Sequence, residues 1–282
     1  MTAATPPSAR RRSLFRAALA RGDGPALGTW VKLPVMESVE LIALAGFDFV
    51  VIDLEHSPIN LETAYRLIGT ASQLGVAPIV RVPTLEAGIV PRVLDAGAEG
   101  VMVPHVDSVA EAAAAVRAVR FPPLGARGVG ATSRAGAWGA LDRTEYLRFG
   151  QEEVVLIAQI ESAAAAAAAG AIAAVDGVDA LLIGAADLST SEGTTEDDPR
   201  IVQLIADAVQ ACVAAGKPVG NAGGATAASV QAAVDAGYTF TLLSNDASLL
   251  GAAARAAVAA GRSVRFPRAA ATARSSSTAN SP

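Results

Sequence analysis

Eight short apolar runs alternate along this chain with segments that favour helix, and this alternation is the strongest constraint on its fold. Each run has the composition of a strand that is buried on both faces of a parallel sheet. Polar residues follow nearly every run, and α/β enzymes carry out their chemistry at the carboxyl ends of such strands. The runs cover residues 27–31, 47–52, 77–80, 99–103, 154–158, 179–183, 217–220 and 238–243.

The segments between these runs carry apolar residues at helical spacing. They are rich in Ala, Leu, Val, Glu and Arg, and they include residues 86–96, 108–119, 199–215 and 226–236. Gly97 and Gly237 close two of them, which suits a left-handed residue after a helix. The alanine run 163–169 follows a strand, and alanine is the best helix former, so we expect the fifth barrel helix there.

Eight alternating strand and helix units predict an α/β fold, the single-domain (β/α)8 TIM barrel. The 282 residues are close to the size of about 250 residues that is usual for this fold. A doubly wound open sheet is the competing architecture, but its polar residues would gather near one switch point. We expect the barrel over residues 13–262 and disordered arms at residues 1–12 and 263–282.

A short helix is expected before the first strand. Leu14, Phe15, Ala18 and Leu19 would share one face of it. Arg16 and Arg21 interrupt what a signal peptide would need as a continuous apolar segment. We therefore expect this helix to close the bottom of the barrel.

Composition indicates a soluble enzyme. With 52% hydrophobic and 17% charged residues, the chain can bury a large core. Asp48 and Asp53 interrupt the best candidate for a membrane span, which needs roughly 18 apolar residues. A formal charge of -5 offers no basic footprint for nucleic acid. Cys212, the single cysteine, lies in an apolar helical pattern, which indicates a buried thiol and a reducing, cytoplasmic setting.

Glu161 and Asp187 follow the fifth and sixth runs, which would be neighbouring strands. Their carboxylates would converge on one hard cation and leave its other positions to water or substrate. Two protein oxygens suit Mg2+ or Mn2+ better than Zn2+, which usually recruits His or Cys. An equally open alternative is that Glu161 caps the alanine helix and Asp187 caps a turn.

A second polar group follows the second and third runs. Arg81 precedes Pro83, so its guanidinium should point into the barrel mouth and hold a carboxylate or an enolate oxygen. A structural ion pair with Asp53 or Glu55 is the alternative, and both can hold at once. His56 suits proton transfer at neutral pH, although a lone histidine after a strand is often only a hydrogen-bonding residue.

Several motifs stand in order along the chain. They are Gly28-Thr29-Trp30, Ala45-Gly46-Phe47-Asp48, Ile52-Asp53-Leu54-Glu55-His56, Val80-Arg81-Val82-Pro83, Leu94-Asp95-Ala96-Gly97, Val103-Pro104, Arg127-Gly128-Val129-Gly130, Gln159-Ile160-Glu161 and Ile183-Gly184-Ala185-Ala186-Asp187-Leu188-Ser189. Together they resemble the HpcH/HpaI aldolases, class II pyruvate aldolases related to the phosphoenolpyruvate-utilising barrels. The resemblance covers about residues 13–261, and the ordered series is more specific than any one motif.

The resemblance implies catalytic roles for five of these residues. Glu161 and Asp187 match the ligands of a divalent metal, which would be Mg2+ or Mn2+, with Co2+ as a further option. Arg81 matches the residue that binds pyruvate and stabilises its enolate. His56 matches the acid/base histidine, and Asp95 matches the acid that pairs with it.

The resemblance also implies supporting residues around the metal and the substrate. The amides near Ala186 and Asp187 should face the pyruvate carboxylate. Ala185 stands where the family more often has proline, a departure that concerns the rigidity of this turn. The supporting residues are Trp30, Asp53, Glu55 and Gln159, of which Gln159 is also expected to contact substrate.

The implied activity is cleavage of a 4-hydroxy-2-oxo acid to pyruvate and an aldehyde, reversible through a metal-bound pyruvate enolate. The alternatives are a lyase for a malyl- or citryl-coenzyme A thioester, an enolate-forming decarboxylase or isomerase, and a non-catalytic 2-oxo-acid-binding protein. The expected partners are a small 2-oxo acid and an aldehyde, without nucleic acid or membrane. Relatives commonly form hexamers that exchange the last barrel helix, here about residues 246–260, so we expect a homo-oligomer.

Other residues near the strand ends have no role assigned by a motif. His105 is expected to pack or to support the site. The glycine-rich stretch at Asn221 is a weak signal for phosphate. Trp138 is expected to pack. Lys32 and Lys217 are the nearest candidates for a Schiff base, and neither matches a catalytic position of the family.

Overall fold

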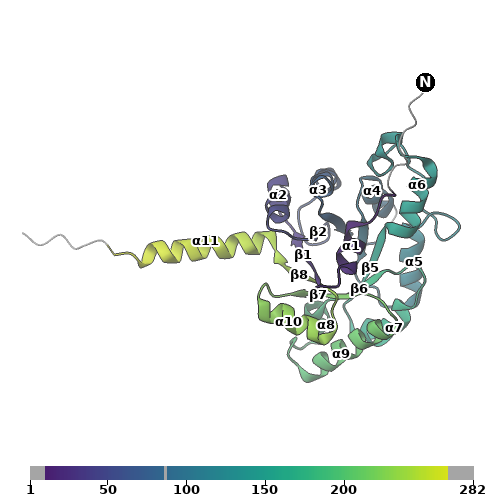
Figure 1. Ribbon diagram of the computed structural model, residues 1–282. Coiled ribbons are helices and arrows are strands. Elements are labelled where there is room, and N and C mark those ends of the chain that lie inside the picture. Colours follow the sequence, from purple (N-terminus) through teal and green to yellow (C-terminus); the bar gives the residue numbers. More distant parts are fainter. Residues whose placement is uncertain (1–9, 86–87, 266–282) are drawn as a thin grey trace, which may run out of the picture. The chain divides into compact units, whose positions relative to one another are not determined.

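A computed structural model describes residues 10–85 and 88–265 of the chain. These residues divide into two compact units, of which the first ends at Ala247 and the second begins at Ser248. In the first unit eight parallel strands pair in chain order and close into a barrel (Figure 1), which confirms the predicted fold and excludes the open sheet. The strands are β1 (Ala26–Val31), β2 (Phe49–Asp53), β3 (Ala77–Arg81), β4 (Gly100–Val103), β5 (Val155–Ile160), β6 (Ala180–Ile183), β7 (Val219–Gly223) and β8 (Phe240–Asn245).

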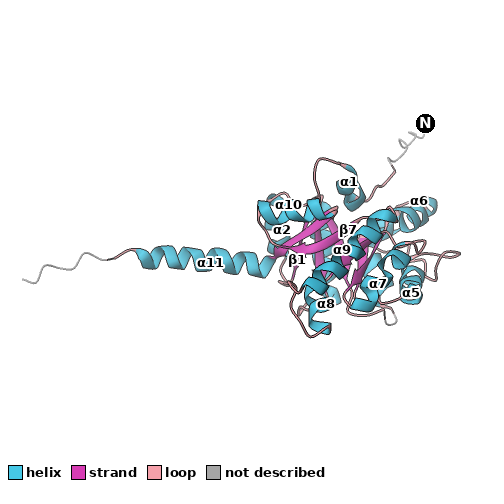
Figure 2. Cartoon of the chain, turned by 90° about the horizontal axis from the view of Figure 1, so that it is seen from below, coloured by secondary structure: helices cyan, strands magenta, loops and turns pink. Residues whose placement is uncertain are grey.

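Helices between the strands surround the barrel (Figure 2). All the predicted helical segments contain a helix, and the alanine run forms α7 (Ala163–Ala173). The predicted segment 86–96 contains α4 (Ile89–Asp95), and its residues 86–87 lie outside the described part of the chain. The others are α1 (Leu14–Ala20), α2 (Met36–Leu44), α3 (Leu61–Gln73), α5 (Val109–Val119), α6 (Arg143–Arg148), α8 (Ala185–Ser191), α9 (Pro199–Ala214), α10 (Ala227–Ala236) and α11 (Asp246–Ser263), with a 3-10 segment at Arg134–Gly139 and a π-helical segment at Phe149–Glu153.

Local sequence explains where several helices begin and end. The side chains of Asn60, Ser108 and Ser162 each accept a hydrogen bond from the main-chain N–H three residues later, as N-cap residues do. Gly97 and Gly237 have φ values of 100° and 103° after α4 and α10, the left-handed conformation predicted for them. Polar caps thus mark the points at which helices begin, and the glycines mark the points at which the chain turns towards the next strand.

Alternate residues of each strand belong to two separate apolar layers, because neighbours on a strand point to opposite faces. Val50 and Ile52 belong to the layer between strands and helices, whereas Phe49 belongs to the barrel interior. Gly220 makes room inside the barrel, since a Cβ there would lie 2.2 Å from the ring of Phe240. The interior is a packed core, so the carboxyl rim is the place for chemistry.

Helix α1 closes the amino-terminal end of the barrel, as the sequence predicts. Phe15 is fully buried, and its ring packs edge-on against Phe49 and Phe240, with centroids 4.9 and 5.4 Å apart. The main-chain N–H of Leu14 donates to Glu99 Oε2 at 2.7 Å. Burial raises the pKa of Glu99. Apolar and polar contacts therefore hold α1 against the end of the barrel.

The expected arms lie largely outside the described residues, and the predicted disorder of residues 1–9 and 266–282 stays a prediction. Arg11 is described, and its main-chain N–H donates to Glu145 Oε1 at 3.0 Å.

Cys212 is buried as predicted, and burial raises the pKa of its thiol to about 11. This thiol is therefore unsuited to act as a nucleophile.

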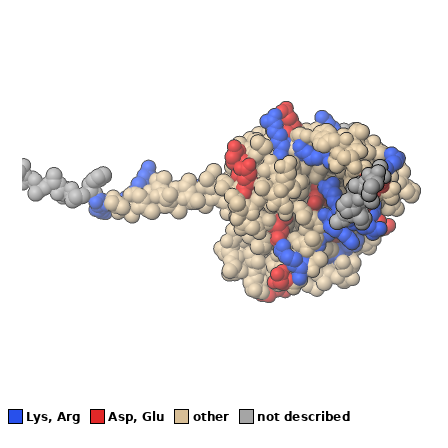
Figure 3. Space-filling model, turned by 45° about the horizontal axis from the view of Figure 1, so that its top comes forward, with Lys and Arg blue, Asp and Glu red and all other residues tan. Residues whose placement is uncertain are grey.

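One face of the described residues carries few charged side chains. On the face drawn in Figure 3, most atoms belong to residues that are neither acidic nor basic. Helix α11 exposes apolar side chains, with Leu250 at 64% and Val258 at 52% exposure. None of the helices within the described ranges is long and apolar enough to cross a membrane.

Candidate active site

The ends of β2, β3, β5 and β6 bring four of the predicted ionisable side chains to one rim of the barrel, because all eight strands run parallel. β2 ends at Asp53 and β3 ends at Arg81, whereas Glu161 follows β5 directly. Asp187 follows β6 in the first turn of α8. The rim thus collects these four residues, and their contacts divide them into two neighbouring groups.

Arg81 is held between two carboxylates in the first group. Its Nε donates to Asp53 Oδ1 at 2.9 Å, and its Nη2 donates to Asp53 Oδ2 at 2.8 Å. Its Nη1 lies 3.1 Å from Glu55 Oε2, and its Cζ lies 4.3 Å from the ring centroid of Trp30. Burial alone would raise the pKa of Asp53, but hydrogen bonds from Arg81 and Lys32 hold that pKa well below its ordinary value. The ion pairs proposed as an alternative therefore exist.

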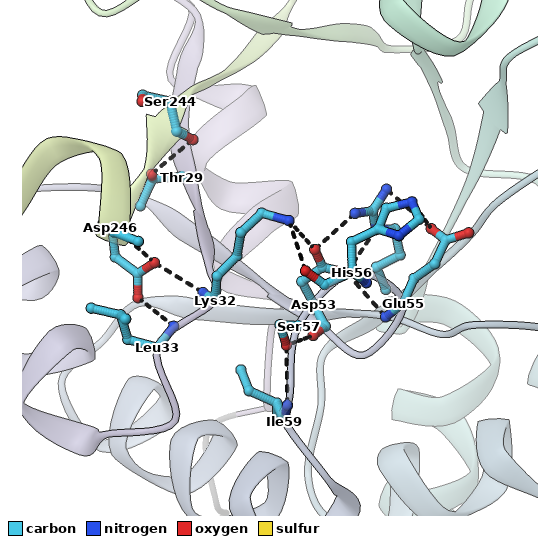
Figure 4. A network of polar contacts seen from close by, with 12 residues as sticks. Thr29, Lys32, Leu33, Asp53, Glu55, His56, Ser57, Ile59, Ser244 and Asp246 are labelled. Atoms are coloured by element: carbon cyan, nitrogen blue, oxygen red, sulfur yellow. Dashed lines mark hydrogen bonds and ion pairs between the residues drawn. The ribbon is translucent and has the colours of Figure 1, made fainter. Parts of the chain in front are cut away.

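His56 presents an exposed imidazole next to this group (Figure 4). Its main-chain N–H donates to Asp53 Oδ1 at 3.1 Å, and its Nε2 lies 3.8 Å from Glu55 Oε2. The side chain is 60% exposed, so it can exchange protons with water and reach a substrate at the rim. Its acid/base role stays a prediction that this geometry permits.

A second imidazole, His105, links the two groups. Its Nδ1 lies 3.3 Å from Glu161 Oε2, and its Nε2 lies 3.5 Å from Glu55 Oε1. Its φ of 52° is left-handed, a strained conformation that is common at functional sites. Sequence reasoning assigned His105 no specific role, because this bridge joins side chains from three strand ends. Its place after a strand was the only signal.

Glu161 is the buried carboxylate of the second group. Gly184 leaves room for it, since a Cβ there would lie 2.8 Å from Glu161 Cγ. Gln159 Nε2 donates to Glu161 Oε1 at 2.8 Å. Burial raises the pKa of Glu161, and the negative charges of Asp187 and Glu55 add to this rise. A cation would relieve the repulsion among these carboxylates.

Other residues perform the capping roles that the sequence left open for Glu161 and Asp187. Ser162 is the N-cap of α7, where its hydroxyl accepts from the main-chain N–H of Ala165 at 3.0 Å. Gly184 is the N-cap of α8, and Asp187 lies inside the first turn of this helix. Glu161 is therefore not the N-cap of α7, and Asp187 is not the N-cap of α8.

The donors around Glu161 fit a hard divalent cation. Glu161 and Asp187 offer carboxylate oxygen, the donor that Mg2+ and Mn2+ prefer. Gln159 Oε1 is buried without a hydrogen-bond partner in the described structure, as expected of an acceptor for water of a hydrated cation. Within residues 10–85 and 88–265, no three His, Cys, Asp or Glu side chains are grouped for a metal. Water and substrate would therefore supply the other ligands.

Asp95 pairs with a different residue from the one expected. It ends α4, and Arg127 Nη2 donates to its Oδ1 at 2.9 Å. The chain after α4 leads to the start of β4, which is the amino-terminal side of the barrel, whereas His56 lies at the carboxyl rim. The contacts of Asp95 within the described residues do not include His56. The pairing of His56 with Asp95 therefore stays a prediction.

Two further expectations differ from the structure. Trp138 does not pack, because its side chain is 66% exposed. Ala137 and Trp138 both have left-handed φ values, 50° and 59°, which interrupt the 3-10 segment and turn the chain there. The stretch from Asn221 to Gly223 belongs to strand β7, which weakens the phosphate-loop interpretation further.

Comparisons with known proteins identify relatives of this chain. The sequence profile of the family described as HpcH/HpaI aldolase/citrate lyase matches residues 26–254, a range that includes every strand of the barrel. The chain is 37% identical over 257 residues to the 2-dehydro-3,6-dideoxy-6-sulfogluconate aldolase of Pseudomonas putida, with 90% of this chain and 99% of that protein covered.

A second relative and a solved structure show the same likeness. The chain is 40% identical over 211 residues to the 4-hydroxy-2-oxovalerate aldolase of Rhodococcus jostii (strain RHA1), with 73% of this chain and 80% of that protein covered. The crystal structure of a HpcH/HpaI aldolase/citrate lyase family protein from Burkholderia cenocepacia J2315 superposes with a TM-score of 0.81 at 36% identity, covering 88% of this chain and 98% of the other.

Proposed function

Because the chain belongs to the HpcH/HpaI aldolase/citrate lyase family, close to the class II pyruvate aldolases, we propose that it cleaves a 4-hydroxy-2-oxo acid to pyruvate and an aldehyde. The observation that carries this proposal is the collection of Glu161, Asp187 and Arg81 at one barrel rim. Such a site offers oxygen ligands for a cation and a guanidinium for an anion.

Glu161 and Asp187 would hold the cation, which we propose to be Mg2+ or Mn2+, with Co2+ as a third option. A bound cation would supply the Lewis acidity that polarises the ketone of the 2-oxo acid. Gln159 orients Glu161 through their hydrogen bond of 2.8 Å. The amides of Ala186 and Asp187 lie in the first turn of α8, where helices leave N–H groups free for an acceptor such as the substrate carboxylate.

Arg81 stabilises the oxygen on which negative charge develops. Asp53 and Glu55 fix its guanidinium in one orientation, and the ring of Trp30 lies over it. A donor that is already oriented stabilises this charge without reorganisation during the reaction. Arg81 therefore favours the enolate over the starting ketone.

His56 moves the proton. In cleavage its imidazole removes the proton from the 4-hydroxyl, the bond between C3 and C4 breaks, and the electron pair of that bond passes to the enolate. C4 then leaves as the aldehyde, and the enolate takes up a proton at C3 to become pyruvate. Glu55 is the acid in contact with His56, whereas Asp95 remains the acid that the family resemblance pairs with it.

Incubation of the purified protein with Mg2+ or Mn2+ and a panel of 4-hydroxy-2-oxo acids tests this proposal. A coupled assay should detect pyruvate, chelator should stop its release, and added cation should restore it. A malyl-coenzyme A thioester and oxaloacetate in the same panel report the lyase and decarboxylase alternatives. Release of pyruvate from none of the 4-hydroxy-2-oxo acids would contradict the proposed reaction, and full turnover in chelator would contradict the metal.

We further propose that the protein is a homo-oligomer in solution, with a hexamer as the expected form. Leu250 and Val258 on α11 are exposed to 64% and 52%. Isolated helices gain little stability in water without packing of an apolar face. Light scattering after gel filtration measures the assembly, and a monomer at micromolar concentration would contradict this proposal.

A further inference from the structure

Lys32 stands at the rim directly after β1, and its main chain is fixed there. The N–H of Lys32 donates to Asp246 Oδ1 at 2.9 Å, and the N–H of Leu33 donates to Asp246 Oδ2 at 3.1 Å. The hydroxyl of Ser38 donates to the same carboxylate at 2.7 Å, and Asp246 is buried. One carboxylate therefore satisfies both main-chain donors where the chain leaves β1.

The strand that leads to Lys32 is irregular. The register of β1 against β8 shifts between Gly28 and Trp30, and Thr29 Oγ1 donates to the carbonyls of Leu243 and Ser244 at 3.0 and 3.2 Å. Ser244 has a left-handed φ of 58°. Bulges beside active sites commonly change the direction of a side chain, and strained residues gather there. The end of β1 thus has the local features of a functional site.

The ammonium group of Lys32 reaches the first group of rim residues, as Figure 4 shows. Lys32 Nζ donates to Asp53 Oδ2 at 2.6 Å and to the main-chain oxygen of His56 at 3.3 Å. Asp53 thus accepts hydrogen bonds from two cationic side chains, Lys32 and Arg81. Lys32 therefore connects the carboxylate that orients Arg81 with the loop that carries His56.

The charges of this group balance only when Lys32 is counted. Asp53 and Glu55 are two negative groups in contact with Arg81, and Lys32 is the second positive group. Without Lys32 the group would carry one net negative charge. Because Asp53 and Arg81 are buried, water screens this charge weakly. Such a charge would oppose the binding of a 2-oxo acid anion at Arg81.

We propose that Lys32 is a positioning residue of this site, which offsets the negative charge of Asp53 and holds the loop after β2, so that no net negative charge opposes the binding of the anionic substrate at Arg81. This inference rests on the proposed function and deepens it. Lys32 acts through Arg81 and Asp53, in contrast to a lysine that forms a Schiff base. Loss of the Lys32 charge should therefore weaken the binding of an anion such as pyruvate without weakening the binding of a cation such as Mn2+.

Lys32→Met tests the proposal, because methionine keeps much of the length of lysine without its charge. We expect the inhibition constant of pyruvate, measured as product inhibition, to rise about tenfold, the equivalent of one ion-pair contact. The affinity for Mn2+, measured by electron paramagnetic resonance, should stay equal or increase, since a cation has been removed. Lys217→Met is the matched control, because Lys217 is the only other lysine and precedes β7.

Two more variants sharpen the test. Lys32→Arg keeps the charge and should recover most of the lost pyruvate affinity, and Lys32→Gln provides a second neutral variant should Lys32→Met fold poorly. Equal pyruvate inhibition in wild type and both neutral variants would overturn the inference. Parallel loss of pyruvate and Mn2+ affinity would show a structural role only, and no recovery with Lys32→Arg would overturn the charge argument. Absence of pyruvate release by the wild type would instead contradict the proposed function.

Discussion

Arg81 and Asp53 face each other through two parallel hydrogen bonds at the barrel rim, where Asp53 is fully buried and Arg81 nearly so. A bidentate contact fixes the plane of the guanidinium as well as its position. Arg81 therefore presents one defined edge to the site. Because both side chains are buried, removing either one should lower the free energy of unfolding.

Asp53→Ala should lower the free energy of unfolding by about 3 kcal/mol, because the buried Arg81 would lose both hydrogen bonds to Asp53 and keep only its contact with Glu55. Urea denaturation measures this change. Glu62→Gln is the control, since it breaks the exposed pair between Glu62 and Arg66, which is worth about 0.5 kcal/mol or less. A variant as stable as wild type would contradict the energetic role of the pair.

The Asp53 pair should also give stability a dependence on pH. The pKa of Asp53 is depressed in the folded state. The contribution of Asp53 to the free energy of unfolding is therefore fully present above the unfolded pKa of about 3.9, and it is lost as the pH falls towards the folded pKa. The difference in unfolding free energy between wild type and Asp53→Asn should therefore shrink below pH of about 4. A difference that stays constant from neutral to acidic pH would contradict this linkage.

Glu161→Gln and Asp187→Asn should each reduce pyruvate release by at least about 100-fold, because each removes a charged oxygen from the proposed cation. Both variants should keep the circular dichroism spectrum of the wild type while losing affinity for Mn2+. Asp235→Asn on α10 is the control and should change neither quantity. Wild-type affinity for Mn2+ in both site variants would refute the ligand assignment.

His56→Ala should slow cleavage about 100- to 1,000-fold, as expected for the loss of a general base. Exchange of the pyruvate methyl protons with deuterium, followed by nuclear magnetic resonance, should slow much less, because enolate formation does not require the 4-hydroxyl. Cleavage and exchange rates that both match the wild type would show that His56 does not move the proton.

Glu99→Gln should make the protein more stable relative to wild type as pH rises. Burial raises the folded-state pKa of Glu99, so the contribution of the wild-type side chain is complete below the unfolded value of about 4.3 and declines as pH rises through the folded value. The glutamine carbonyl can still accept from Leu14. Urea denaturation between pH 4 and pH 8 measures the difference, and a difference independent of pH would contradict the raised pKa.

Much of the barrel was predictable because its signals are local. Apolar runs at the eight strand positions, helical spacing between them and glycines after α4 and α10 all act within a few residues. The same holds for α1, where Phe15 and Ala18 share the buried face. Asp53, Arg81, Glu161 and Asp187 were assigned to the rim because parallel strands bring their carboxyl ends together.

Side-chain partners from distant segments were not predictable in this way. Arg127 pairs with Asp95, and His105 bridges Glu55 and Glu161. Trp138 was expected to pack, but left-handed backbone at Ala137 and Trp138 turns the chain there, and no periodicity reports such a turn. These features depend on the positions of several elements at once.

The amino-acid sequence by itself determined the eightfold alternation and the rim to which its acidic, basic and imidazole groups belong. Only the tertiary structure decided that Lys32 joins the pair of Asp53 and Arg81 that the sequence had offered, and that Ser162 rather than Glu161 caps α7. The physical reason is the separation along the chain of the residues that interact. Periodicity and capping act between near neighbours, whereas a buried charge takes its partner from whichever strand end lies within hydrogen-bonding distance.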